Sequence, residues 1–189
     1  MRKGRLDLSC ENDGDEYKRT VEVSSRLIIR YYGQGSKKHL WLTEIDHLIL
    51  TEHYLVPISV KYWGGSVDAT QERDWVQKKS SGTIRSMKNP WRDLFNTTCS
   101  IKQLLRNAGQ NLPDRVVVPM LVFSNDAMCL SNAESISPNI LTLKPFVIQL
   151  RRLLHPEKET GEICLHTLEK LPVDRESTID YAEEKSKTF

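Results

Sequence analysis

The chain has 189 residues, enough for one domain with a short appendage. Hydrophobic residues make up 39% of it and charged residues 28%, so it can bury an ordinary core and does not have the composition of a disordered chain. The net charge is +2, no segment approaches the roughly 20 apolar residues that cross a bilayer, and no apolar run follows the basic first residues. We therefore expect a soluble, cytoplasmic protein without a membrane segment.

The first half of the chain predicts a helix followed by a strand pair. Residues 16–32 carry apolar side chains mostly three, four or seven positions apart, which favours a helix, although β-branched residues weaken that pattern. Residues 40–51 and 55–62 are apolar runs joined by a short turn, which predicts an antiparallel hairpin. Residues 66–70 together with residues 75–79 can supply a third strand.

The clearest helix of the sequence begins near the middle of the chain. Asn89 is a good N-cap, and Pro90 is tolerated at the first helical position. Apolar or small residues then recur every three or four positions, and Gly109 stands where a C-cap belongs. This pattern predicts one amphipathic helix.

The rest of the chain mixes strands with helices. Residues 115–124 are typical of a buried strand, in which Pro119 requires a bulge or an edge position. Residues 140–143 predict a short strand and residues 146–155 a helix, while residues 156–189 form a charged appendage that we expect to be helical in pieces. Strands and helices mixed in this way imply an α/β or α+β layer fold.

Two carboxylates and a lysine interrupt the apolar hairpin. Glu44 and Asp46 share one face of the first strand, because strand side chains alternate between faces. The second strand places Lys61 on the same face as Pro57 and Ser59. Burying uncompensated charge costs several kcal/mol, so such a cluster usually has a partner. Two interpretations stay open: a partly exposed ion pair, or a divalent cation on hard oxygen ligands with the lysine beside a metal-bound water.

The net charge hides a basic segment at residues 73–106. It holds eight Lys or Arg and only two acids, Asp74 and Asp93. A cationic surface that also carries Trp75 and Trp91 suits a nucleic-acid backbone, because cations displace counterions and flat rings stack on bases. An ordinary solvated face is the alternative. The candidate nucleic-acid contacts are Lys78, Lys79, Arg85, Lys88 and Arg92.

The hairpin and its surroundings resemble the nuclease-related domain (NERD) family. Residues 43–51 read TEIDHLILT, which is similar to the family's E-I-D-H strand, and residues 58–65 read ISVKYWGG, where the family has an apolar strand ending in E-V-K. Trp75, the Asn89–Pro90 helix start and the late apolar strand follow in the family's order. The resemblance spans roughly residues 16–154, and we identify residues 1–155 as a NERD-like domain.

The resemblance implies an α/β fold with a restriction-endonuclease-like core of the PD-(D/E)xK class: a mixed central sheet with an antiparallel hairpin, flanked by helices. It implies that Asp46 and Glu44 face Mg²⁺ or Mn²⁺, and that Lys61 orients or deprotonates the attacking water. The implied reaction is hydrolysis of DNA phosphodiester bonds, which needs a hard cation, a positioned water and a nearby base.

Two positions depart from the family's pattern. The second metal-binding carboxylate falls on Ser59, and the glutamine of the family's Asn-Pro-x-x-Gln falls on Asp93. Losing one of two carboxylates weakens a Mg²⁺ site, unless Glu44, Asp93 or Glu16 supplies the missing charge. The alternative is a catalytically inactive module that binds nucleic acid or a protein partner, a second copy of the chain included. His47 belongs to the motif but is expected to pack rather than to bind metal.

Overall fold

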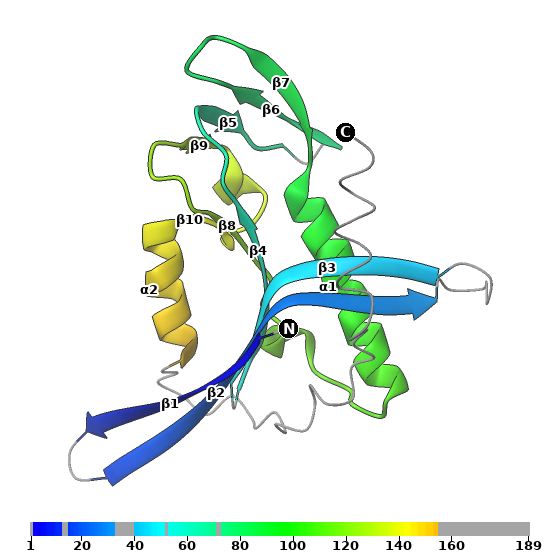
Figure 1. The fold of residues 1–189 in the computed structure, drawn as a ribbon, viewed down its shortest axis with the longest axis vertical. Helices are drawn as coiled ribbons and strands as arrows, with labels where there is room; N and C mark the ends of the chain where they lie inside the picture. Colours follow the sequence, from blue (N-terminus) through cyan, green and yellow to red (C-terminus); the bar gives the residue numbers. More distant parts are fainter. Residues whose placement is uncertain (1, 13–14, 33–39, 52, 71–72, 155–189) are drawn as a thin grey trace.

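The structure is a computed structural model that describes residues 2–12, 15–32, 40–51, 53–70 and 73–154. The appendage predicted at residues 156–189 lies outside the described residues. Figure 1 shows the arrangement of the elements. In chain order they are β1 (Arg2–Asn12), β2 (Asp15–Tyr32), β3 (Leu40–Leu50), β4 (Leu55–Lys61), β5 (Ser66–Asp68), β6 (Asp74–Lys78), β7 (Ile84–Lys88), α1 (Pro90–Asn107), the 3-10 helix η1 (Asp114–Val116), β8 (Met120–Phe123), β9 (Cys129–Ser131), the 3-10 helix η2 (Ala133–Ser135), β10 (Ile140–Thr142) and α2 (Leu143–Leu154).

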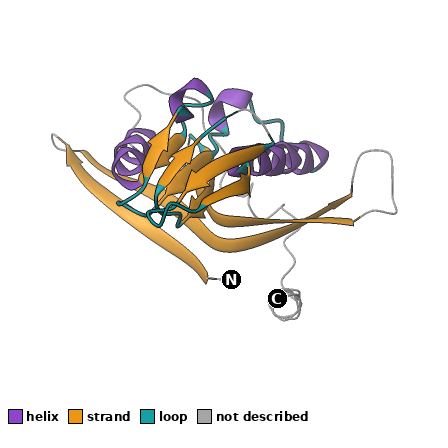
Figure 2. Ribbon diagram, turned by 90° about the horizontal axis from the view of Figure 1, so that it is seen from above, coloured by secondary structure: helices purple, strands orange, loops and turns teal. Residues whose placement is uncertain are grey.

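The main sheet has six strands in the order β1-β2-β3-β4-β8-β10. Strands β1 to β4 pair antiparallel, while β4 pairs with β8, and β8 with β10, in parallel. The predicted hairpin of β3 and β4 is confirmed, with Leu50 opposite Leu55 at the turn. Helices flank this mixed sheet (Figure 2), which confirms the predicted α/β class and is consistent with a restriction-endonuclease-like core.

Strand β4 carries the two halves of the core on its two faces. Val56 and Ile58 pack with residues of β3 and β8 and with Leu153 of α2. Leu55 packs on the opposite face against Ile101 and Leu105 of α1. The alternation predicted for β4 is therefore confirmed, and the odd-numbered side chains of this strand face the side covered by α1.

A second, four-stranded sheet has the order β7-β6-β5-β9. Its core contains Trp75 of β6 and Phe123 of β8, whose rings stack with centroids 6.3 Å apart. Leu94 of α1 packs in the same cluster. The segments predicted as a third strand thus pair with each other, but they do so in this second sheet and not beside the hairpin.

Residues 16–32 form a strand, so the predicted helix is wrong. Strand β2 pairs along its length with β1 and β3, including Val23 with Ile49 and Ile28 with Glu44. Its β-branched residues suit a pleated sheet better than a helix. The pairing of β2 with β1 and β3 was not visible in the local apolar spacing.

Proline is tolerated in the two central strands because the ladder between them has a gap. Val118 donates to the carbonyl of Leu55, and regular pairing resumes at Ile58 with Met120. The same register sets Pro57 opposite Pro119. Pro57 therefore removes a donor only inside this gap, and Pro119 precedes β8 where β10 has not yet begun to pair.

Helix α1 forms as predicted. The Asn89 side chain accepts a hydrogen bond from the amide of Arg92 at 3.0 Å and donates to the carbonyl of Thr70 at 3.3 Å. Gly109 follows the helix with a φ of +82°, a conformation that favours glycine. Among the described residues, no helix is long and apolar enough to span a membrane.

Replacing the N-cap should destabilise the protein measurably. Asn89→Ala removes an acceptor for a helix amide and a donor to Thr70, so we expect the free energy of unfolding to fall by about 0.5–2 kcal/mol in urea titrations. Asn96→Ala makes the same chemical change at an exposed position inside the helix and should leave stability unchanged or slightly higher. Equal effects of both variants would show that the cap contributes nothing.

Candidate functional site

Asp46 lies where the strand pairing on both sides of β3 is interrupted. The ladder to β4 ends at His47 with Ile58. The ladder to β2 pairs positions 25 with 47 and 27 with 45, but it has no pair at Asp46 itself. Continuing the β3–β4 register beyond its last pair would set Asp46 opposite Ser59 and Glu44 opposite Lys61. Asp46 and Ser59 therefore lie where the hairpin opens, and their side chains are in contact there.

One oxygen of Asp46 bridges β3 and β4 where their backbone pairing ends. Its Oδ2 accepts a hydrogen bond of 2.7 Å from the backbone amide of Val60 and one of 3.1 Å from Oγ of Ser59. The carbonyl of Lys61 points to β8, where it accepts from Ser124, so the neighbouring amide of Val60 points to β3. The carboxylate thus takes the place of a backbone carbonyl in the ladder.

Strand β3 does not alternate regularly at this point. Leu48 and Leu50 are buried on the α1 side, but Ile45 is buried in the same cluster. Strict alternation would put Ile45 on the opposite face from Leu48. The Asp46 carboxylate also reaches the backbone of β4 and does not stand clear of the sheet. The expectation that Glu44 and Asp46 share one regular face of β3 is therefore corrected at Asp46.

Ser59 and Lys61 lie on the α1 side of β4, in register with Leu121 and Phe123 of β8. Lys61 is half-buried and forms no ion pair with a carboxylate of the described residues, so the predicted salt-bridge interpretation finds no support at this lysine. Glu44 is exposed.

The oxygen ligands at Asp46 suit a divalent cation only in part. In the described portion of the chain, no group of three or more His, Cys, Asp or Glu side chains could hold a metal ion. The Ser59 hydroxyl donates to Asp46, where a second carboxylate would offer two more acceptors. Oδ1 of Asp46 accepts no hydrogen bond from the described residues. Mg²⁺ is commonly held by one or two carboxylates together with substrate phosphate, and the donor set fits that weaker mode.

Most of the predicted nucleic-acid contacts lie on the hairpin of β6 and β7. Lys78, Arg85 and Lys88 are exposed on its strands, Lys79 follows β6 at the tip, and Arg92 is exposed on α1. The register sets Arg85 opposite the buried Gln77, so this arginine is on the inner face of the hairpin, unlike the two strand lysines. The basic residues therefore surround the hairpin and do not form one flat patch.

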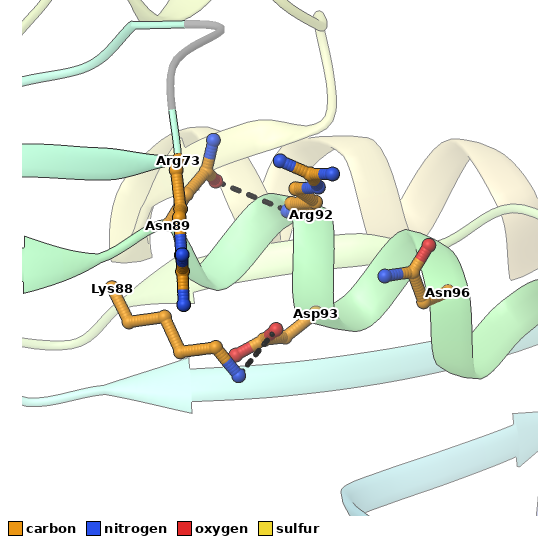
Figure 3. A pocket seen from close by; sticks show the side chains of 6 residues that line it. All are labelled: Arg73, Lys88, Asn89, Arg92, Asp93 and Asn96. Atoms are coloured by element: carbon orange, nitrogen blue, oxygen red, sulfur yellow. Dashed lines mark hydrogen bonds and ion pairs between the residues drawn. The ribbon is translucent and has the colours of Figure 1, made fainter.

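A pocket of about 290 Å³ opens between this hairpin and the start of α1. In Figure 3, Arg73 extends past Asn89 toward the ion pair of Lys88 with Asp93, whose atoms are 2.9 Å apart, and Arg92 points away from that pair. Asp93 is thus paired with a lysine. The sequence did not predict the pocket; the residues lining it are Arg73, Lys88, Asn89, Arg92, Asp93 and Asn96.

Trp75 cannot stack on a nucleic-acid base in this structure, contrary to the expectation from the basic segment. Its side chain is fully buried, its Nε1 donates to the carbonyl of Thr70 at 2.7 Å, and its ring stacks on Phe123. Trp91 is partly buried against the same cluster. The sequence showed that rings accompany the charges, but not which face of the strand they occupy.

The comparisons with known proteins give one match. A family model described as nuclease-related domain (NERD) matches residues 20–124, more than half of the chain. A comparison with curated proteins and one with solved structures give no match. The matched segment contains Asp46, Ser59, Lys61 and the whole β6–β7 hairpin.

The structural role of Asp46 can be separated from any chemical role. Asp46→Ala leaves the Val60 amide without its acceptor, and we expect it to lower the free energy of unfolding by about 1–3 kcal/mol and to speed hydrogen exchange at that amide. Asp46→Asn keeps an acceptor oxygen and should recover most of this loss. Asp126→Ala, at an exposed loop position, is the matched control. If Asp46→Ala behaves like the control, the bond does not support the strand.

Proposed function

The chain belongs to the family of nuclease-related domains, and we propose on this premise that it hydrolyses DNA phosphodiester bonds at Asp46 with the help of Mg²⁺ or Mn²⁺. The observation that carries the proposal is the fixed carboxylate at the hairpin opening. Oδ2 of Asp46 is held by Val60 and Ser59, and Oδ1 accepts no hydrogen bond from the described residues. Lys61 follows directly after Val60 on β4 and supplies a cation on the α1 side.

Each residue of the candidate site would have a separate role in the hydrolysis. Asp46, with Glu44 as the second carboxylate, would hold the cation, which when bound polarises a phosphate oxygen and lowers the pKa of a water. The Val60 amide fixes the orientation of Asp46. Lys61 either activates the attacking water or stabilises the negative charge that develops on the phosphate. Ser59 contributes no charge, so the cation would depend on the DNA phosphate for binding.

A second candidate function has its own support. The bond from Ser59 to Asp46 satisfies one oxygen of the carboxylate without a metal, and the described residues contain no cluster of three metal ligands. A module of this kind would hold nucleic acid, or a protein partner, without cutting. The difference between the two functions lies in turnover and not in the fold, so an assay must measure cleavage and binding on the same samples.

The hydrolytic proposal makes a direct prediction for duplex DNA with Mg²⁺ or Mn²⁺. We expect Asp46→Asn and Lys61→Ala each to lower the cleavage rate by at least about 100-fold, because each removes a group that acts on the reacting phosphate. Lys144→Ala and Asp126→Ala remove the same charges at exposed positions elsewhere and should cleave like the wild type. Cleavage that survives both site substitutions would end the enzymatic proposal.

Restoring the missing carboxylate should strengthen metal use. Ser59→Glu, or the shorter Ser59→Asp, adds a hard ligand beside Asp46, so we expect the Mg²⁺ concentration for half-maximal cleavage to fall by roughly tenfold. Ser135→Glu adds the same charge at an exposed site and should have no effect. If wild type and both Ser59 variants bind the duplex without cutting it, the second candidate function is the correct one.

A further inference from the structure

The β6–β7 hairpin has one buried face and one exposed face. On β6, Trp75 and Gln77 are buried, whereas Asp74, Val76 and Lys78 are exposed. The strand pairs set Lys78 opposite Ile84, Val76 opposite Ser86 and Asp74 opposite Lys88. These six side chains share the outward face, because paired residues project to the same side of a sheet. Figure 1 shows the hairpin projecting at one end of the molecule.

The buried face fixes the hairpin to the end of β4. Nε2 of Gln77 donates to the carbonyl of Gly64 at 2.7 Å. A Cβ at Gly65 would lie 2.2 Å from the carbonyl oxygen of Lys78, so only glycine allows this close approach. Gly64 is three residues beyond Lys61, and the Trp75 ring stacks on Phe123, the residue in register with Lys61. The hairpin is therefore held in a fixed position relative to the candidate site.

The outward face combines exposed apolar side chains with cations. Ile84 is 67% exposed and Val76 is 48% exposed, and they lie diagonally across the two strands. Lys78 and Lys88 flank them on the same face, where Lys88 is opposite Asp74 and forms an ion pair with Asp93 of α1. Keeping a side chain like Ile84 in water is unfavourable, so an apolar contact in a complex would stabilise that complex.

We propose that the β6–β7 hairpin is a ribbon that enters a groove of duplex DNA, with Ile84 and Val76 against the bases and Lys78 on the phosphates. The proposal rests on the proposed function, because it takes DNA as the partner. The positive charge of the ribbon is complementary to the DNA backbone. A two-stranded ribbon also fits the width of the major groove.

The composition of the face favours a duplex over a single strand. Single-stranded DNA is usually bound by aromatic rings on which bases stack, and none of the six outward side chains is aromatic. Trp75, the aromatic residue of β6, is turned inward. Aliphatic side chains can instead contact thymine methyl groups in the groove or wedge against a base step.

Binding measured without metal tests the ribbon apart from hydrolysis. Fluorescence anisotropy of the full chain with a labelled duplex and the matching single strand, in EDTA at several salt concentrations, gives affinity and its salt slope. We expect Ile84→Ser to weaken duplex binding roughly three- to tenfold without changing the slope, and to affect the single strand less. Lys78→Gln should reduce the slope by about one unit.

The controls make the same changes on α2, which lies on the opposite side of the main sheet from α1. Ile148 is 55% exposed and Lys144 is exposed, so Ile148→Ser and Lys144→Gln should leave both affinity and slope unchanged. If the wild type binds the duplex but hairpin and control variants behave alike, the ribbon proposal fails while DNA remains the partner. If the wild type binds no DNA, the proposed function itself fails. The ribbon proposal then fails with it, and the exposed face of the hairpin would have to bind a protein instead.

Discussion

The hydrogen bond from the Val60 amide to Asp46 is the constraint on which the candidate site depends. Strand β4 lies between an antiparallel and a parallel neighbour, so its backbone N–H and C=O groups need hydrogen-bond partners on both edges. Where β3 and β4 part, the Val60 amide would lose its acceptor, and the carboxylate replaces it at 2.7 Å. A side chain used in this way cannot rotate freely. The sheet thereby orients Asp46 before any ligand arrives, as a site for chemistry requires.

Ser59 changes the energetics of this centre. Two carboxylates side by side without a cation repel each other, and this repulsion raises the pKa of at least one of them. A serine hydroxyl that donates to Asp46 removes that repulsion and stabilises the centre without metal. The same substitution lowers the charge available to a cation, so stability of the metal-free domain and metal affinity oppose each other at position 59. The hairpin of β6 and β7, anchored near Lys61 through Gly64 and Phe123, would then contribute DNA affinity that the metal does not.

How much the sequence could predict differs between elements for physical reasons. The β3–β4 hairpin and α1 were predictable because their patterns are local: an alternation of apolar residues on β4, and an N-cap with a proline ahead of an amphipathic stripe. Strand β2 was predicted as a helix, because its apolar spacing is ambiguous and does not reveal the pairing with β1 and β3. The motif located Asp46, Ser59 and Lys61. It could not reveal the Val60 contact, which exists only where two ladders end, or the burial of Trp75, which depends on the face that β6 turns inward.

The central claim is that Asp46 binds a divalent cation together with the phosphate of bound DNA. Binding of Mn²⁺ to the full chain, followed by electron paramagnetic resonance with and without a non-cleavable duplex, tests it most directly. The account predicts weak binding of Mn²⁺ by the protein alone, tighter binding once the duplex is present, and loss of the tighter binding in Asp46→Asn. Binding of Mn²⁺ that is equally tight in Asp46→Asn with the duplex present would contradict it.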